Sequence, residues 1–227
     1  MRGTSIDYDR ILSDLMPREC EALSDLLSEF LPPLWERAYR KMSQVPTSIR
    51  RFSDHNYTLL FDHASQLVER GVIPKSRAVD DRIVAAFGRT RAAPPGRNGG
   101  CAQGLLGPFS GMFGGDAGKE QTMGHALGGG LSLNLFPLRR DLSSELSSDG
   151  RGFRSMERYC HKHPGLLCFT RPIYDTKSWW PCAVEHGVLR TDRTLWIRTF
   201  ENSESGSWIP SIAGRRTATS ERRVAEA

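Results

Sequence analysis

The chain has 227 residues, of which 38% are hydrophobic and 25% are charged. This composition predicts a folded protein and excludes a chain that is disordered throughout. The net charge of +5 favours a polyanionic partner, such as nucleic acid or an acidic surface.

No apolar run approaches the roughly 20 residues that a transmembrane helix needs. Asp7, Asp9 and Asp14 interrupt the N-terminus where a signal peptide would have its apolar core. We therefore expect no membrane span, and either a cytoplasmic location or export by a non-classical route. The 5 cysteines are an odd number, which favours a reducing compartment over a disulfide framework.

The first part of the chain has apolar residues at spacings of three and four, as in Leu23, Leu26, Leu27 and Phe30, which predicts helices. We expect the adjacent prolines 32 and 33 to end one helix. Three further helices are predicted, over residues 34–42, 55–71 and 76–88. Residues 1–88 are accordingly predicted to form a helical region.

Residues 89–121 are dense in Gly, Pro and Ala, which predicts a linker or a long loop. The C-terminal half has a different pattern. A helix is predicted between Ser147 and Gly165, with Phe153, Met156 and Tyr159 or Cys160 on its inner side. Three strands are then expected, over residues 166–174, 181–189 and 193–202, with a tight turn at 190–194 between the last two. The basic tail, 213–227, is predicted to be disordered.

The stretch MGHALGGGLSLNLFPLRRDL, residues 123–142, fits neither an ordinary helix nor an ordinary strand. His125 has four glycines within five residues, and glycines allow the backbone to approach a bulky ligand closely. Asn134 offers an amide oxygen to a hard cation such as Mg²⁺. Arg139 and Arg140 offer charges that bind phosphate. A neutral imidazole, a divalent cation and arginines are the components of phosphodiester hydrolysis.

This stretch resembles the DNA/RNA non-specific endonuclease family, whose metal site is a ββα unit. That family typically shows Asp-Arg-Gly-His, then Asn-x-x-Pro-Gln, then Leu-Asn-x-Gly, and then a helix that carries a glutamate. Here Gly124-His125 matches the first motif, and Asn134-Leu-Phe-Pro137 matches the second. The resemblance covers about forty residues, from Thr122 to Tyr159.

The resemblance implies an α+β protein in which a ββα-metal-like nuclease domain with a small antiparallel sheet, residues 122–212, follows the helical region. It implies a metal-dependent nuclease that uses Mg²⁺ or Mn²⁺ to cleave DNA, RNA or both. His125 would be the general base, Asn134 and Ser143 would hold the metal, and Arg139 and Arg140 would contact phosphate. The family also implies a toxin or effector with a protein inhibitor as a further partner.

The sequence departs from the family pattern at three points. Leu138 replaces the usual glutamine, the usual Asp-Arg before Gly-His is absent, and Ser143 falls where the metal-binding asparagine is expected. Glu157 is fourteen residues beyond Ser143, which is about 21 Å in one continuous helix, too far to share a metal. Either the helix begins later, near Ser148, or Glu157 has another role. A catalytically decayed binding protein and an unrelated interaction module therefore remain as alternatives.

Two further clusters have alternative interpretations. Cys160, His163, Cys168 and Cys182 have zinc-binding residue types, but without a Cys-x-x-Cys pair buried structural cysteines are the preferred interpretation. The tryptophans, such as Trp196, would stack on bases or fill the core, and their alternating strand positions favour the core. A serine hydrolase is not favoured, because no Gly-x-Ser-x-Gly motif is present.

Overall fold

The computed structural model describes residues 6–15, 20–54, 57–90, 117–121, 135–139, 142 and 147–202. The helices are α1 (Tyr8–Leu15), α2 (Cys20–Ser43), α3 (Ala64–Glu69) and α5 (Ser148–Lys162), with a short 3-10 helix η1 (Lys75–Arg77). The strands are β1 (Ile49–Asp54), β2 (Tyr57–Asp62), β3 (Arg82–Arg89), β4 (Ala117–Gln121), β5 (Leu135–Arg139), β6 (Leu167–Ile173), β7 (Ala183–Leu189) and β8 (Leu195–Glu201).

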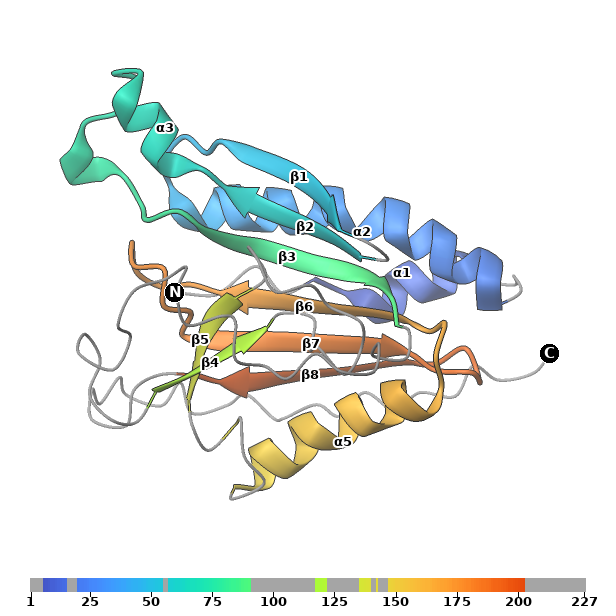
Figure 1. Cartoon of the computed structure of the whole chain (residues 1–227). Coiled ribbons are helices and arrows are strands. Elements are labelled where there is room, and N and C mark those ends of the chain that lie inside the picture. The colour runs from blue at the N-terminus through green and yellow to red at the C-terminus, as the bar shows by residue number, and fades with distance from the viewer. Residues whose placement is uncertain are drawn as a thin grey trace.

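Six strands form one antiparallel sheet in the order β1-β2-β3-β6-β7-β8 (Figure 1). Strand β3 pairs with β6, with Phe87 opposite Phe169, so the two halves of the chain share this sheet. Strands β4 and β5 form a separate two-stranded antiparallel sheet. The predicted α+β class is confirmed.

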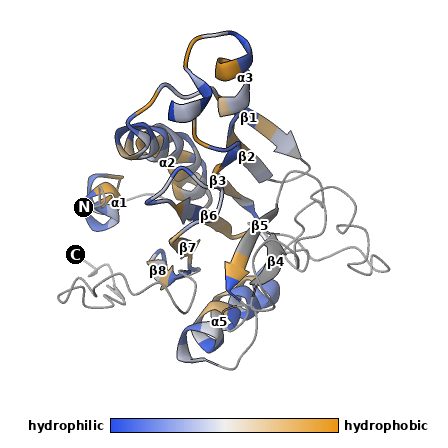
Figure 2. Ribbon diagram, turned by 90° about the vertical axis from the view of Figure 1, so that its left-hand side faces the viewer, coloured by the Kyte–Doolittle hydropathy of each residue, from blue (hydrophilic) through white to orange (hydrophobic). Residues whose placement is uncertain are grey.

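The helices cover the two faces of the six-stranded sheet (Figure 2). On one face, α1 and α2 bury Leu23, Leu27 and Trp35 against strand residues such as Phe169. On the other, α5 buries Phe153 and other residues together with the end of β5. Within the described part of the chain, no helix is long and apolar enough to cross a membrane.

The helices predicted over residues 55–71 and 76–88 are wrong. Most of these residues form β2, the short helix α3 and β3, and the unpredicted strand β1 precedes them. Strand β3 lies in the middle of the sheet and is buried on both faces from Arg82 to Phe87. A strand buried on both faces has a continuous apolar sequence, which periodicity does not distinguish from that of a buried helix.

The predicted helix break at Pro32 and Pro33 is also wrong, because α2 continues through both prolines. A proline inside a helix costs about 3 kcal/mol, since it removes a backbone hydrogen bond and its ring crowds the preceding turn. Buried Leu27, Leu31 and Trp35 lie at spacings of four on both sides of the prolines. Packing of this face on the sheet stabilises the continuous helix against that cost.

The helix and the three strands predicted between residues 147 and 202 are confirmed, whereas the predicted tail, 213–227, lies outside the described residues. Helix α5 and the three strands β6, β7 and β8 occupy the expected segments, and Arg190 donates to the Thr194 carbonyl oxygen at 2.8 Å across the expected turn. Along β8, Leu195 and Ile197 face the α2 side, whereas Trp196 and Phe200 pack on the α5 side. This arrangement confirms the core interpretation for Trp196.

A buried polar network attaches α1 to the sheet. The guanidinium of Arg171 on β6 donates two hydrogen bonds, at 2.9 and 3.1 Å, to the carboxylate of Glu185 on β7. The Tyr8 hydroxyl of α1 donates to the same carboxylate and accepts from the Trp35 indole at 2.9 Å. Polar groups within an apolar core are stable only when they are hydrogen-bonded, and this network meets that requirement.

Candidate functional site

The β4–β5 hairpin and helix α5 follow one another in the strand-strand-helix order that the family resemblance implies. Strand β4 lies at the end of the segment 89–121 that was predicted to be a linker or a long loop, so that prediction is wrong for its last five residues. Gln121 at the end of β4 pairs with Leu135 at the start of β5. Residues 122–134 join these paired ends, and His125 and Asn134 fall in this connection. His125, Asn134, Arg140 and Ser143 lie outside the described residues.

The end of β5 is fixed to the body of the protein. Leu138 and Leu142 are fully buried in the cluster that also contains Phe153 of α5. The backbone N–H of Arg139 donates to the Asn202 side-chain oxygen at 2.7 Å, and the Asn202 amide group donates to the Pro181 carbonyl oxygen at 2.9 Å. Asn202 is fully buried, and it therefore holds β5 against the strand ends of β7 and β8.

Helix α5 begins at Ser148, as the sequence allows. The Ser147 hydroxyl caps the helix by accepting from the Gly150 backbone N–H at 2.9 Å. Asp149 in the first turn lies 3.4 Å from the Arg198 guanidinium of β8. That guanidinium lies directly on the helix backbone, since a Cβ at Gly152 would be 1.8 Å from it. Gly152 therefore permits the close approach of α5 and β8.

Glu157 has a partner of its own within α5. Its carboxylate forms an ion pair with the Arg154 guanidinium, one turn earlier, and its side chain is 16% exposed. Burial raises the pKa of the Glu157 carboxyl, while Arg154 acts in the opposite direction. This contact supports the alternative role for Glu157 that the sequence spacing suggested.

The two sides of α5 differ in chemistry. Phe153, Met156 and Cys160 are buried against the sheet, as predicted. The opposite side carries the exposed cations Arg151, Arg158 and Lys162 and the half-buried Arg154. Sequence reasoning considered only the buried side and missed this row of cations, although the sequence contains it.

His186 on β7 is a second residue that sequence reasoning missed. Its Nδ1 lies 2.8 Å from the Thr170 hydroxyl, and its ring lies 5.3 Å from that of Phe153. Among the described residues, its Nε2 has no hydrogen-bond partner. Burial lowers the pKa of His186 to about 4, so its imidazole is neutral at pH 7. We interpret it as a core residue beneath α5.

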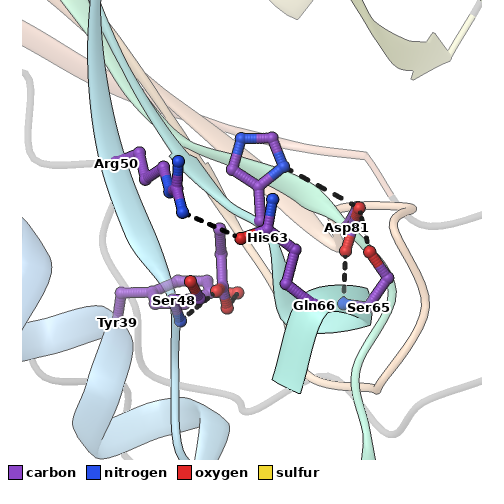
Figure 3. Close-up of polar contacts among 8 residues, drawn as sticks. Tyr39, Ser48, Arg50, His63, Ser65, Gln66 and Asp81 are labelled. Carbon is purple, nitrogen blue, oxygen red and sulfur yellow. Dashed lines mark hydrogen bonds and ion pairs between the residues drawn. The ribbon is translucent and has the colours of Figure 1, made fainter. Parts of the chain in front are cut away.

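A cluster of His63, Ser65 and Asp81 contains the residue types of a serine hydrolase (Figure 3). The Ser65 hydroxyl donates directly to Asp81 at 2.7 Å, and the Ser65 backbone N–H donates to the other carboxylate oxygen at 2.7 Å. The His63 Nδ1 lies 4.0 Å from Asp81 Oδ2, the same carboxylate oxygen that accepts from the Ser65 hydroxyl, so the histidine is not between serine and aspartate. A catalytic triad needs histidine between serine and aspartate, so this cluster holds the start of α3 instead.

Two cysteines of the alternative zinc site lie in the core, whereas Cys182 is half-buried. Cys160 and Cys168 are buried, and a hydrogen bond between them, together with burial, raises the pKa of the Cys168 thiol. His161 and His163 are exposed. Within the described ranges, no group of three or more His, Cys, Asp or Glu side chains is placed to hold a metal ion. The preferred interpretation, buried cysteines, is confirmed for this pair.

No protein-family model and no curated protein matches this chain.

Proposed function

We propose that the chain is a metal-dependent nuclease of ββα type that hydrolyses phosphodiester bonds of DNA, RNA or both. The observation that carries the proposal is the β4–β5 hairpin followed by α5, with His125 and Asn134 in the segment that joins the two strands. A toxin or effector role, with a protein inhibitor as partner, belongs to the same proposal.

In this proposal His125 is the general base. A neutral imidazole takes the proton from the attacking water, and Arg139 and Arg140 neutralise charge on the phosphate. Arg139 is suited to this role because its backbone is fixed by Asn202 at the end of β5.

The proposed metal ligands are Asn134 and Ser143, oxygen donors of the kind that Mg²⁺ or Mn²⁺ accepts. A bound cation would supply positive charge at the scissile phosphate. Glu157, the α5 glutamate considered for the family's helical glutamate, is already paired with Arg154. We therefore assign Glu157 no role at the metal.

A second candidate function is a catalytically decayed protein that binds nucleic acid without cleaving it. Leu138 favours this candidate, because the position where the family has glutamine is fully buried in the core. Ser143 also favours it, since a neutral hydroxyl binds Mg²⁺ less well than an amide carbonyl does.

Cleavage of plasmid DNA and of RNA by the full chain, with Mg²⁺, Mn²⁺ or EDTA, tests the proposal. We expect metal-dependent cleavage that falls at least a hundredfold in His125→Ala, in line with the loss of a general base. His163→Ala, which removes an exposed histidine at the end of α5, is the matched control and should cleave like the wild type. A folded wild type that cleaves neither substrate with either metal would reject the nuclease and favour the binder.

A further inference from the structure

Strand β1 is one of the two outer strands of the six-stranded sheet (Figure 1). Within the described ranges it pairs with β2 alone, so its other edge is open. Arg50, Arg51 and Ser53 of this strand are exposed. An open strand edge is a template on which another strand can pair.

The backbone groups at this edge can be assigned from the pairing of β1 with β2. The Ser48 carbonyl oxygen, directly before β1, accepts from the His63 backbone N–H at 3.1 Å. In an antiparallel pair alternate residues bond to the partner strand, so residues 50, 52 and 54 bond to β2. The backbone N–H and C=O groups of Arg51 and Ser53 therefore point to the open side, and no described residue bonds to them.

The side chains on the two faces of β1 leave this edge accessible. The Arg51 guanidinium lies 5.9 Å from the centroid of the Phe87 ring, on the α2 face. On the opposite face, Arg50 donates to Gln66 of α3 at 3.1 Å (Figure 3). Both arginines are exposed, so neither α2 nor α3 covers the strand.

The other outer strand, β8, is less accessible. Trp196 packs on Tyr159 of α5, and the Arg198 guanidinium lies against the α5 backbone at Gly152. On the opposite face, Leu195 lies in one hydrophobic cluster with residues of α1. Helices therefore flank β8 on both faces, which favours β1 as the strand that pairs.

The sequence of β1, Ile-Arg-Arg-Phe-Ser-Asp, is complementary to itself in one antiparallel register. A register centred on Phe52 places Arg51 opposite Ser53 of a second copy, so that the outward backbone groups of these residues bond to one another. It also places Arg50 opposite Asp54, and cross-strand residues of opposite charge stabilise a sheet. A register centred on Arg50 or Arg51 would place like charges opposite each other, and one centred on Ser53 would pair only residues 52–54.

We propose that two copies of this chain associate through β1, by antiparallel pairing of the two strands about a twofold axis at Phe52. The two six-stranded sheets then form one continuous sheet. The same surface is used on both copies, so the contact closes as a dimer and does not extend into a fibre. One pair of strands is a small interface, so the dimer is weak and forms at micromolar or higher concentration. This inference is independent of the proposed nuclease function.

Sedimentation velocity of the full chain, at concentrations up to about 300 µM, measures the dissociation constant of this weak dimer. Ser53→Pro removes the outward N–H and keeps the hydrogen bonds between β1 and β2. The matched control is Thr199→Pro, at an exposed residue of β8 whose N–H likewise points away from the neighbouring strand. We expect Ser53→Pro to raise the dissociation constant roughly tenfold or more, because each dimer loses two hydrogen bonds. Thr199→Pro should leave it within about twofold of the wild type.

An exchange of charges tests the register without a proline. Asp54→Arg places like charges opposite each other and should raise the dissociation constant roughly fivefold or more, whereas Arg50→Asp/Asp54→Arg should restore it to within about threefold of the wild type. Circular dichroism verifies that each variant is folded. A wild type that is monomeric at about 300 µM, a dimer that Ser53→Pro does not weaken, or a charge exchange without restoration would overturn the inference. Larger oligomers that Thr199→Pro abolishes would also overturn it, since they would indicate pairing of β1 with β8.

Discussion

At the scale of single residues, His186 makes the free energy of unfolding depend on pH. Its pKa is about 4 in the folded protein against an ordinary 6.5, so the unfolded chain binds the proton more readily between these values. The free energy of unfolding should therefore fall as the pH decreases from about 6.5 towards 4. From pH 7 to pH 5 we expect His186 alone to lower it by about 2 kcal/mol.

Urea denaturation at pH 7 and pH 5 measures this effect. His186→Asn removes the titration and keeps a polar partner for Thr170, so the difference between the two pH values should shrink by about 2 kcal/mol. His163→Asn, an exposed histidine, should keep the wild-type difference. If His186→Asn lost as much stability as the wild type over this range, protonation of His186 would not be the cause.

The sequence identified candidate residues of the site, but it did not reveal the contacts that position them. Arg139 was recognised by its charge, but its fixed backbone depends on Asn202, a residue 63 positions away, which no local pattern reveals. His186 lies between Glu185 and Gly187 in β7, and no local pattern reveals that its Nε2 has no partner among the described residues. The roles of His125 and Asn134 rest on the motif and stay predictions.

At the scale of secondary-structure elements, the success of prediction depended on how many faces of an element are buried. Helix α5 and strand β8 each have a more exposed side, so their apolar residues recur with the period of a helix or a strand. Strand β3 has no such side over its first six residues, and its sequence Ile-Val-Ala-Ala-Phe reads equally well as a buried helix. Contacts that complete a sheet are distant in sequence, which is why local patterns missed β3.

The attachment of the β4–β5 hairpin to the sheet gives a prediction at the same scale. Asn202→Ala would leave the Arg139 N–H and the Pro181 carbonyl oxygen without the partner they have now. Each buried polar group left unsatisfied costs about 1–3 kcal/mol, so we expect about 2–4 kcal/mol of destabilisation.

Hydrogen exchange separates this local effect from a general loss of stability. In Asn202→Ala the Arg139 amide should exchange faster by a larger factor than the amides of the central strands β6 and β7. Thr191→Ala, in the exposed turn between β7 and β8, should leave the Arg139 amide unchanged. Uniform acceleration of all these amides in Asn202→Ala would show that Asn202 stabilises the whole protein rather than the hairpin.

At the scale of the whole molecule, the two faces of the sheet have different roles. The α5 face carries the β4–β5 hairpin, and the α2 face carries the buried network around Glu185. That network joins α1 and α2 to β6 and β7, a pair of strands distant from these helices in the sequence. Substitutions in this network should therefore change the stability of the fold without altering a residue of the candidate site.

Substitutions in this network should lower the free energy of unfolding by very different amounts. Glu185→Gln leaves the buried Arg171 guanidinium without its carboxylate, and breaking a buried ion pair from one side costs about 3–5 kcal/mol. Tyr8→Phe keeps that ion pair and removes the hydroxyl that bridges Glu185 and Trp35, so we expect about 1–2 kcal/mol. Tyr159→Phe is the matched control, because the contacts of its hydroxyl within the described residues, at 3.4 and 3.5 Å with Thr191, are long.

Urea denaturation of the three variants at pH 7 gives the ranking, with the control expected within about 0.5 kcal/mol of the wild type. Limited proteolysis should then show where each variant opens. In Tyr8→Phe, cleavage should begin near α1, because that helix is joined to Glu185 through the Tyr8 hydroxyl. Cleavage that began instead in β6 or β7 would mean that the network stabilises the centre of the sheet first and the attachment of α1 only through it.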